Sequence, residues 1–203
     1  MKTILSDLDG VLVDSHESIM RAWQWWGALH GVEAQAIESV QHGRPSGEVI
    51  AALTPDLDAA AESRAIDLRQ ADDTEGVVAL PGAHELLAGS EPVAIVTSCT
   101  IPLATARLRA AGLPIPEVLV TPERLALGKP DPEGYLLAAR ELGADPGDCV
   151  VLEDAPAGVD AGRAAGMHVV GITTTHPLVE LAAHEHAPSI AAWLQTRNGQ
   201  SPS

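Results

Sequence analysis

The sequence from Thr3 to Ser15 reads TILSDLDGVLVDS. It begins with a short apolar run that is typical of a β-strand, and two acidic residues follow at the end of that run. Asp7 and Asp9 stand two positions apart, so their side chains leave the same face of an extended chain. Gly10 then allows a sharp turn. Because carboxylates beside a buried apolar strand are costly unless they are paired, we expect a functional site at this strand end.

Four further apolar runs also predict strands, and helical patterns separate them. The five predicted strands cover Thr3–Leu8, Val93–Ser98, Glu117–Thr121, Cys149–Asp154 and His168–Thr173. All but the first are almost continuously apolar, as parallel strands buried on both faces are. Helices are predicted after Thr100, after Asp131 and from Ala157, each with a glycine near its end. This alternation predicts an α/β fold with a doubly wound, Rossmann-like, mainly parallel sheet.

The segment of residues 15–79 departs from this alternation. It is rich in alanine, lacks a strand-like run and is expected to form several helices. In the first of them Ile19, Trp23, Trp26 and His30 recur at spacings of three and four. That spacing predicts a stripe that packs against neighbouring helices. We therefore expect an inserted all-α cap domain over residues 15–79 and a core domain made of residues 1–14 and 80–203.

Polar side chains lie at or just after the ends of four of the predicted strands, at the edge where ligands bind in open α/β sheets. They are Asp7 and Asp9 at the end of the first strand, Ser98 at the end of the second, Lys129 in the loop after the third, and Glu153 and Asp154 at the end of the fourth. One carboxylate can attack phosphorus and another can carry a proton. A hydroxyl and an ammonium group can bind phosphoryl oxygens, and further carboxylates suit Mg²⁺. A loop lysine or an acidic pair at a helix start is ordinary by itself, but the full set predicts Mg²⁺-dependent phosphoryl transfer.

The composition excludes several other classes of function. The chain has 12 basic and 28 acidic residues, a formal net charge of -16, and no phenylalanine. Such a charge repels nucleic acids and anionic membranes, so neither is an expected partner. Two cysteines, Cys99 and Cys149, are too few for a disulfide framework. No apolar stretch approaches the length of a membrane span, so we expect a soluble cytoplasmic protein, with its oligomeric state left open.

The four motifs together resemble those of the haloacid-dehalogenase superfamily of phosphotransferases, with a helical cap inserted after the first motif. The resemblance implies that Asp7 is the nucleophile that forms an aspartyl-phosphate and that Asp9 is the general acid/base. It also implies that Ser98 and Lys129 hold the phosphoryl group. The metal site it implies consists of Asp7, the backbone carbonyl of Asp9, and Asp154, with Glu153 as a direct or supporting group, and its cofactor is Mg²⁺.

Within this superfamily the chain is similar to the glycerol-phosphatase and sugar-phosphatase branch. The similarity lies in the stretch from His42 to Arg44, in the return to the core at 75–82, and in residues 173–177. It implies a small sugar, polyol or glycerol phosphate as the partner, with His42 and Arg44 facing its hydroxyl groups. Thr97 and Cys99 flank Ser98 and are expected to line the substrate site as well. Cys99 stands where this branch typically has glycine.

Two other functions remain as alternatives. A sugar-phosphate mutase related to β-phosphoglucomutase is the nearer one, but such enzymes carry a cap histidine and a cap arginine where this chain has Ile19 and Ser46. A receiver-like signalling domain would place its phosphorylated aspartate on the third strand and would lack the cap. Dehalogenases lack a second acid at the position of Asp9, and phosphonate hydrolases need a cap lysine, which is absent between residues 3 and 128.

The remaining histidines carry no assigned function. His184 and His186 flank Glu185, and this group is expected to lie on a solvated helix face. Alternate residues of a helix diverge, so a metal site is not expected there.

Overall fold

A computed structural model describes residues 2–41, 46–197 and 199 of the 203-residue chain. Its main feature is a six-stranded sheet with the strand order β5-β4-β1-β6-β7-β8, in which every neighbouring pair is parallel. The strands are β1 (Thr3–Ser6), β4 (Val93–Val96), β5 (Val118–Val120), β6 (Cys149–Glu153), β7 (His168–Ile172) and β8 (Glu185–Ala187). The predicted α/β class is therefore confirmed, with a sixth strand that the sequence pattern did not indicate.

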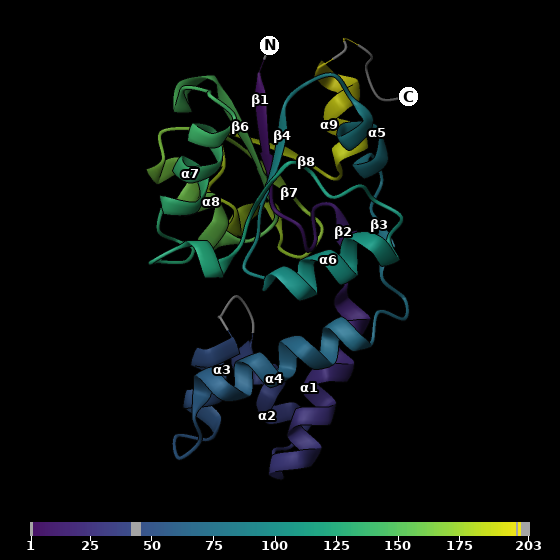
Figure 1. The fold of residues 1–203 in the computed structure, drawn as a ribbon, viewed down its shortest axis with the longest axis vertical. Helices are drawn as coiled ribbons and strands as arrows, with labels where there is room; N and C mark the ends of the chain where they lie inside the picture. Colours follow the sequence, from purple (N-terminus) through teal and green to yellow (C-terminus); the bar gives the residue numbers. More distant parts are fainter. Residues whose placement is uncertain (1, 42–45, 198, 200–203) are drawn as a thin grey trace.

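Helices cover both faces of this sheet (Figure 1). One face packs against α5 (Ala83–Ala88), α6 (Ile101–Ala110) and α9 (Ile190–Arg197), and the other against α7 (Glu133–Glu141) and α8 (Pro156–Ala164). Successive residues of β1 serve opposite faces, as the two-residue period of a strand requires. Ile4 contributes to the first layer with Trp193, and Leu5 contributes to the second with Tyr135. All four of these side chains are buried, which confirms the doubly wound arrangement.

The inserted segment forms four described helices that lie below the sheet in Figure 1. They are α1 (His16–His30), α2 (Ala34–Gln41), α3 (Ser46–Leu53) and α4 (Ala59–Asp72). They share their own apolar cluster, in which Trp23 and Trp26 meet edge to face with their ring centroids 5.6 Å apart. The predicted packing role of the tryptophan stripe is thus confirmed.

A short antiparallel ribbon connects the inserted helices to the sheet. Strand β2 (Val13–Asp14) precedes α1, strand β3 (Val78–Ala79) follows α4, and the two strands pair with each other. The ribbon therefore ties together the two points at which the chain leaves and re-enters the core. The domain boundaries expected at 14/15 and 79/80 fall at the ends of these two strands and stay a prediction.

The expected helix at His184 and His186 is wrong, because this segment forms β8 at the edge of the sheet. Val170, Gly171 and Ile172 of β7 pair with Glu185, His186 and Ala187. His184 accepts a hydrogen bond from the Val169 amide at 3.0 Å through Nδ1, and His186 is 2.8 Å from the Leu181 carbonyl through Nε2. Pairing with the edge of β7 therefore makes this segment a strand, although its polar sequence is not typical of one.

Three short 3₁₀ turns complete the described elements: η1 (Pro122–Arg124), η2 (Pro146–Asp148) and η3 (Leu178–Glu180). Among the described residues no helix is both long and apolar enough to cross a lipid bilayer.

The turn at Gly82 provides a test of this packing. Gly82 has φ of 93°, and a Cβ there would lie 2.3 Å from the backbone nitrogen of Ala191 in α9. We expect Gly82→Ala to lower the free energy of unfolding by about 2–4 kcal/mol through left-handed strain and a backbone clash. Gly143→Ala is the matched control, because Gly143 has φ of 67° but no atom within 4 Å, and its cost should be about 1 kcal/mol. Urea unfolding measures both, and equal losses would show that α9 does not constrain this turn.

Candidate active site

The first acidic motif lies where β1 leaves the sheet. The Asp7 amide still donates to the Leu152 carbonyl of β6 at 2.9 Å, so Asp7 is held by the sheet itself. Gly10 then turns the chain with φ of 73°. A Cβ at Gly10 would lie 2.0 Å from Oδ2 of Asp154, so only glycine allows the first motif to approach the carboxylate of the neighbouring strand end this closely.

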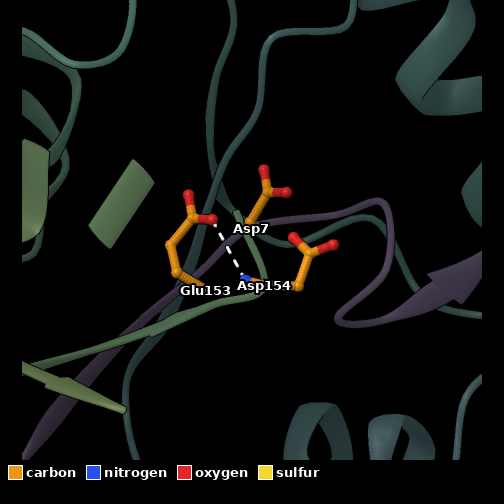
Figure 2. Close-up of side chains that lie close together, drawn as sticks. All are labelled: Asp7, Glu153 and Asp154. Atoms are coloured by element: carbon orange, nitrogen blue, oxygen red, sulfur yellow. Dashed lines mark hydrogen bonds between the residues drawn. The ribbon is translucent and has the colours of Figure 1, made fainter. Parts of the chain in front are cut away.

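Three buried carboxylates converge at the ends of β1 and β6. Asp7, Glu153 and Asp154 each offer an oxygen within 4.8 Å of the others, and Figure 2 shows their side chains around a common space. Their exposed fractions are 9%, 0% and 5%. Because β1 and β6 are neighbours in the sheet, residues separated by almost 150 positions in the chain meet at one edge. A purely oxygen donor set of this kind suits a hard cation such as Mg²⁺.

Lys129 supplies the positive charge of this cluster. It arrives from the loop between β5 and α7, and its Nζ lies 2.7 Å from Asp7 Oδ1, 2.6 Å from Glu153 Oε1 and 3.0 Å from the Val96 carbonyl. Burial opposes the charge on Lys129, but the carboxylates of Asp7 and Glu153 outweigh burial and raise its pKa above the ordinary value. Lys129 is therefore a fixed cation in the site.

One lysine does not compensate three buried carboxylates. Burial raises the pKa of Asp7 to about 7, with Lys129 lowering it and the charges of Glu153 and Asp9 raising it. Burial, followed by repulsion from Asp7 and Glu153, also raises the pKa of Asp154 well above its usual range. In the absence of a further cation, protons are thus held on this cluster near neutral pH.

Protein donors already surround the carboxylate of Glu153. Its Oε1 accepts from the Tyr135 hydroxyl at 2.7 Å as well as from Lys129, and its Oε2 accepts from the Asp154 amide at 3.2 Å, the contact dashed in Figure 2. These contacts fit a supporting role that orients Lys129 and the turn at Asp154. Tyr135 was not identified from the sequence, where it reads as an ordinary apolar residue of a helix.

A polar loop after β7 supports the other side of the site. The Thr175 hydroxyl donates to Asp154 Oδ2, and the Thr174 hydroxyl donates to the Gly10 carbonyl. His176 lies beside them, with Nδ1 3.0 Å from the Asp154 carbonyl. In the sequence, residues 173–177 stand out only by their similarity to the sugar-phosphatase branch. Its position directly after a strand end is the signal that could have identified it as part of the site.

Asp9 lies at the same edge, and both of its carboxylate oxygens are hydrogen-bonded. Ser15 Oγ donates to Oδ1 at 2.6 Å, and Cys99 Sγ lies 2.9 Å from Oδ2. The guanidinium of Arg107 also donates to Oδ2. Cys99 is buried, and burial raises the pKa of its thiol well above the ordinary value, so it is a neutral hydrogen-bond donor here and not a nucleophile.

The residues after β4 open onto a cavity of about 290 Å³. Ser98 is exposed, whereas Thr97 is buried and its hydroxyl accepts from the Cys99 amide at 3.1 Å. Thr97, Ser98 and Lys129 are among the residues that line the cavity, together with Leu125 and Tyr135. The structure thus brings Asp7, Asp9, Ser98, Lys129, Glu153 and Asp154 to one edge of the sheet. His42 and Arg44 lie outside the described residues.

Comparison with known proteins agrees with this arrangement. A family model described as haloacid dehalogenase-like hydrolase matches residues 1–166. Hexitol phosphatase A of Escherichia coli is 47% identical over 178 residues, which cover 84% of this chain and 82% of that protein. Glycerol-1-phosphate phosphohydrolase 2 of Saccharomyces cerevisiae is 32% identical over 191 residues, covering 86% of this chain and 75% of that protein.

Among solved structures, a Thermotoga maritima protein described as a candidate β-phosphoglucomutase superposes with a TM-score of 0.68 and 25% identity. That superposition covers 98% of this chain and 99% of the other. The family match, the relatives and the geometry of the strand ends lead to the same conclusion. The chain belongs to the haloacid dehalogenase-like hydrolases.

Proposed function

We propose that this hydrolase is a Mg²⁺-dependent phosphatase that cleaves a small sugar, polyol or glycerol phosphate through an aspartyl-phosphate. The observation that carries the proposal is the position of Lys129, whose ammonium group lies between Asp7 and Glu153 while Asp154 faces the same space. A nucleophilic carboxylate, a fixed cation and an oxygen donor set together suit an anionic phosphoryl group.

The residues of the acidic cluster fit a divalent cation. Asp7 and Asp154 would hold Mg²⁺ together with the backbone carbonyl of Asp9, while Glu153 keeps Lys129 and the following turn in place. The raised pKa values of Asp7 and Asp154 support this fit, because burial and the neighbouring carboxylates raise them by more than Lys129 lowers them, and a bound cation would offset this. When bound, Mg²⁺ supplies charge compensation for the phosphoryl oxygens and for the nucleophile.

The reaction then follows from the chain's own residues. A carboxylate oxygen of Asp7 attacks phosphorus and the ester P–O bond breaks, while Asp9 gives a proton to the departing alkoxide. Ser98 and Lys129 bind the phosphoryl oxygens during this transfer. In the second half-reaction Asp9 takes a proton from water, the water oxygen bonds to phosphorus, and the P–O bond to Asp7 breaks. Asp7 is thereby regenerated and inorganic phosphate leaves.

The substrate class rests on the relatives and on the cap. The relatives named above are, by their descriptions, phosphatases of hexitol and glycerol phosphates. We propose that residues 15–79 act as a cap over the bound ester and that His42 and Arg44 face its hydroxyl groups. Thr97 and Cys99 would line the same space beside Ser98.

A sugar-phosphate mutase is the second candidate, because the Thermotoga maritima protein described as a candidate β-phosphoglucomutase shares the fold. Ile19 argues against it, since this side chain packs against the apolar cluster of the cap and supplies no polar group. Hydrolysis is the function that we favour.

The first test is a panel of hexitol, hexose and glycerol phosphates assayed with MgCl₂. We expect release of inorganic phosphate from at least one of them, and Asp7→Asn should lower the rate by about 10⁴-fold or more because the nucleophile is lost. Asp148→Asn, an exposed acid before β6 at the opposite edge of the sheet, is the control and should keep full activity. Isomerised sugar phosphate with little free phosphate would identify a mutase instead. Phosphate release by pure Asp7→Asn at the wild-type rate would contradict the assignment of the nucleophile.

The second test follows from the pKa values of the acidic cluster. Asp7, with a pKa of about 7 in the folded metal-free protein and an ordinary value near 3.8, binds a proton more tightly when folded. The stability of the metal-free protein should therefore fall as pH rises from about 4 to 7. Binding of Mg²⁺ requires the deprotonated carboxylates, so its stabilising effect should grow over the same range.

Thermal unfolding measures this effect. With 10 mM MgCl₂ we expect Tm to rise by about 5 °C at pH 8 and by less than about 2 °C at pH 5.5. Asp154→Asn should abolish the rise, whereas Asp160→Asn, at an exposed position of α8, should not. An equal rise at both pH values, or one that survives in Asp154→Asn, would show that the ion binds elsewhere.

A further inference from the structure

Arg107 is a buried charged residue that the proposed reaction does not use. It lies on α6, one helical turn after Leu103, on the face that packs against the sheet, and only 2% of its surface is exposed. A buried guanidinium is costly unless its charge is paired and its N–H groups are hydrogen-bonded. The groups that pair with Arg107 therefore indicate what this residue does.

The first of these groups is Asp9. Nη1 of Arg107 donates to Asp9 Oδ2 and lies 2.9 Å from Cys99 Sγ. The other carboxylate oxygen, Oδ1, accepts from Ser15 Oγ at 2.6 Å. Donors from α6, from the turn after β4 and from the residue before α1 thus hold the Asp9 carboxylate from separate segments. Contacts to both oxygens restrict rotation of the carboxylate about its Cβ–Cγ bond.

The second group comes from the inserted helices. Nη2 of Arg107 donates to Oε1 of Gln70, which lies on α4 and is 5% exposed. Asp67, one turn earlier on α4, adds a negative charge near the same guanidinium. Helix α4 lies directly below α6 in Figure 1 and packs against it. The guanidinium is therefore held at one end by Asp9 and at the other end by the cap.

We propose that Arg107 is a positioning residue for Asp9 and that Gln70 of the cap holds Arg107 in place. The inference rests on the proposed function, in which Asp9 passes a proton to the leaving alkoxide. Such a transfer needs the carboxyl group within hydrogen-bond reach of the ester oxygen and correctly oriented. The contact with Gln70 makes this orientation depend on a helix of the cap.

The leaving group of the substrate separates this role from a merely structural one. The leaving group of an alkyl phosphate is a strongly basic alkoxide, which needs a proton as it departs. The leaving group of p-nitrophenyl phosphate is a stable phenolate, which departs with little help from a proton donor. A poorly oriented Asp9 should therefore impair the alkyl ester selectively. The experiment measures kcat/KM for p-nitrophenyl phosphate and for the alkyl phosphate that the wild-type enzyme cleaves best. The constant kcat/KM is used because it reports the step that expels the leaving group.

The variants are Arg107→Met, Arg107→Lys and Gln70→Leu, with Arg109→Met as the matched control. Arg109 lies on the same helix as Arg107 but is exposed. We expect Arg107→Met to lower kcat/KM by about 10²-fold on the alkyl ester and by less than about fivefold on p-nitrophenyl phosphate. With Arg107→Lys, kcat/KM on the alkyl ester should be about tenfold higher than with Arg107→Met. Gln70→Leu should lower kcat/KM about fivefold on the alkyl ester and leave kcat/KM on p-nitrophenyl phosphate unchanged. Arg109→Met should match the wild type on both esters.

Thermal unfolding and near-UV circular dichroism check that each variant is folded. If Arg107→Met does not fold, Arg107→Lys and Gln70→Leu still decide the question, since both keep the volume of the buried site. Equal losses on the two esters, or no loss on the alkyl ester in any folded variant, would overturn the positioning role while leaving the phosphatase intact. A wild-type enzyme that cleaves neither ester would overturn the proposed function and this inference together.

Discussion

The ammonium group of Lys129, placed between the carboxylates of Asp7 and Glu153, is the contact on which the rest of the site depends. It joins the end of β1, the loop before α7 and the end of β6. Without this cation, buried acids from neighbouring strands would face one another uncompensated, at a cost that rises steeply with burial. Because β1 and β6 are adjacent and parallel, the sheet brings these acids together, and the lysine offsets part of their mutual repulsion.

The site also has a second layer of contacts. Tyr135 holds Glu153, Thr175 holds Asp154, and Arg107 holds Asp9. Each of these residues comes from an element other than the one that bears its acid, so every carboxylate of the site is oriented by tertiary contacts. Such support fixes the geometry of reacting groups to a degree that the strand ends alone do not. Through Arg107 and Gln70 it also links Asp9, the acid/base of the proposed reaction, to the helical insertion.

Much of this architecture could be predicted from local patterns. The apolar runs at β1, β4, β5, β6 and β7 and the helix signals at α6 and α7 were identified because each element carries its own period and its own boundaries. The edge strand β8 was missed because its polarity resembles that of a solvated segment, and only its pairing with β7 makes it a strand. The antiparallel pair β2 and β3 was missed for the same reason, since two residues are too few to show a pattern.

The sequence by itself determined five of the six strands of the main sheet, the helical insertion and the six polar residues at the strand ends, because side-chain periodicity and strand-end chemistry are local properties. Only the tertiary structure decided which groups hold those residues. Arg107 and Gln70 lie 37 positions apart on two helices, and nothing in either helix indicates that they bond to each other or that Arg107 also reaches Asp9. A buried hydrogen bond between distant segments depends on how the helices pack, and the packing of the whole core determines where a long polar side chain finds its partner.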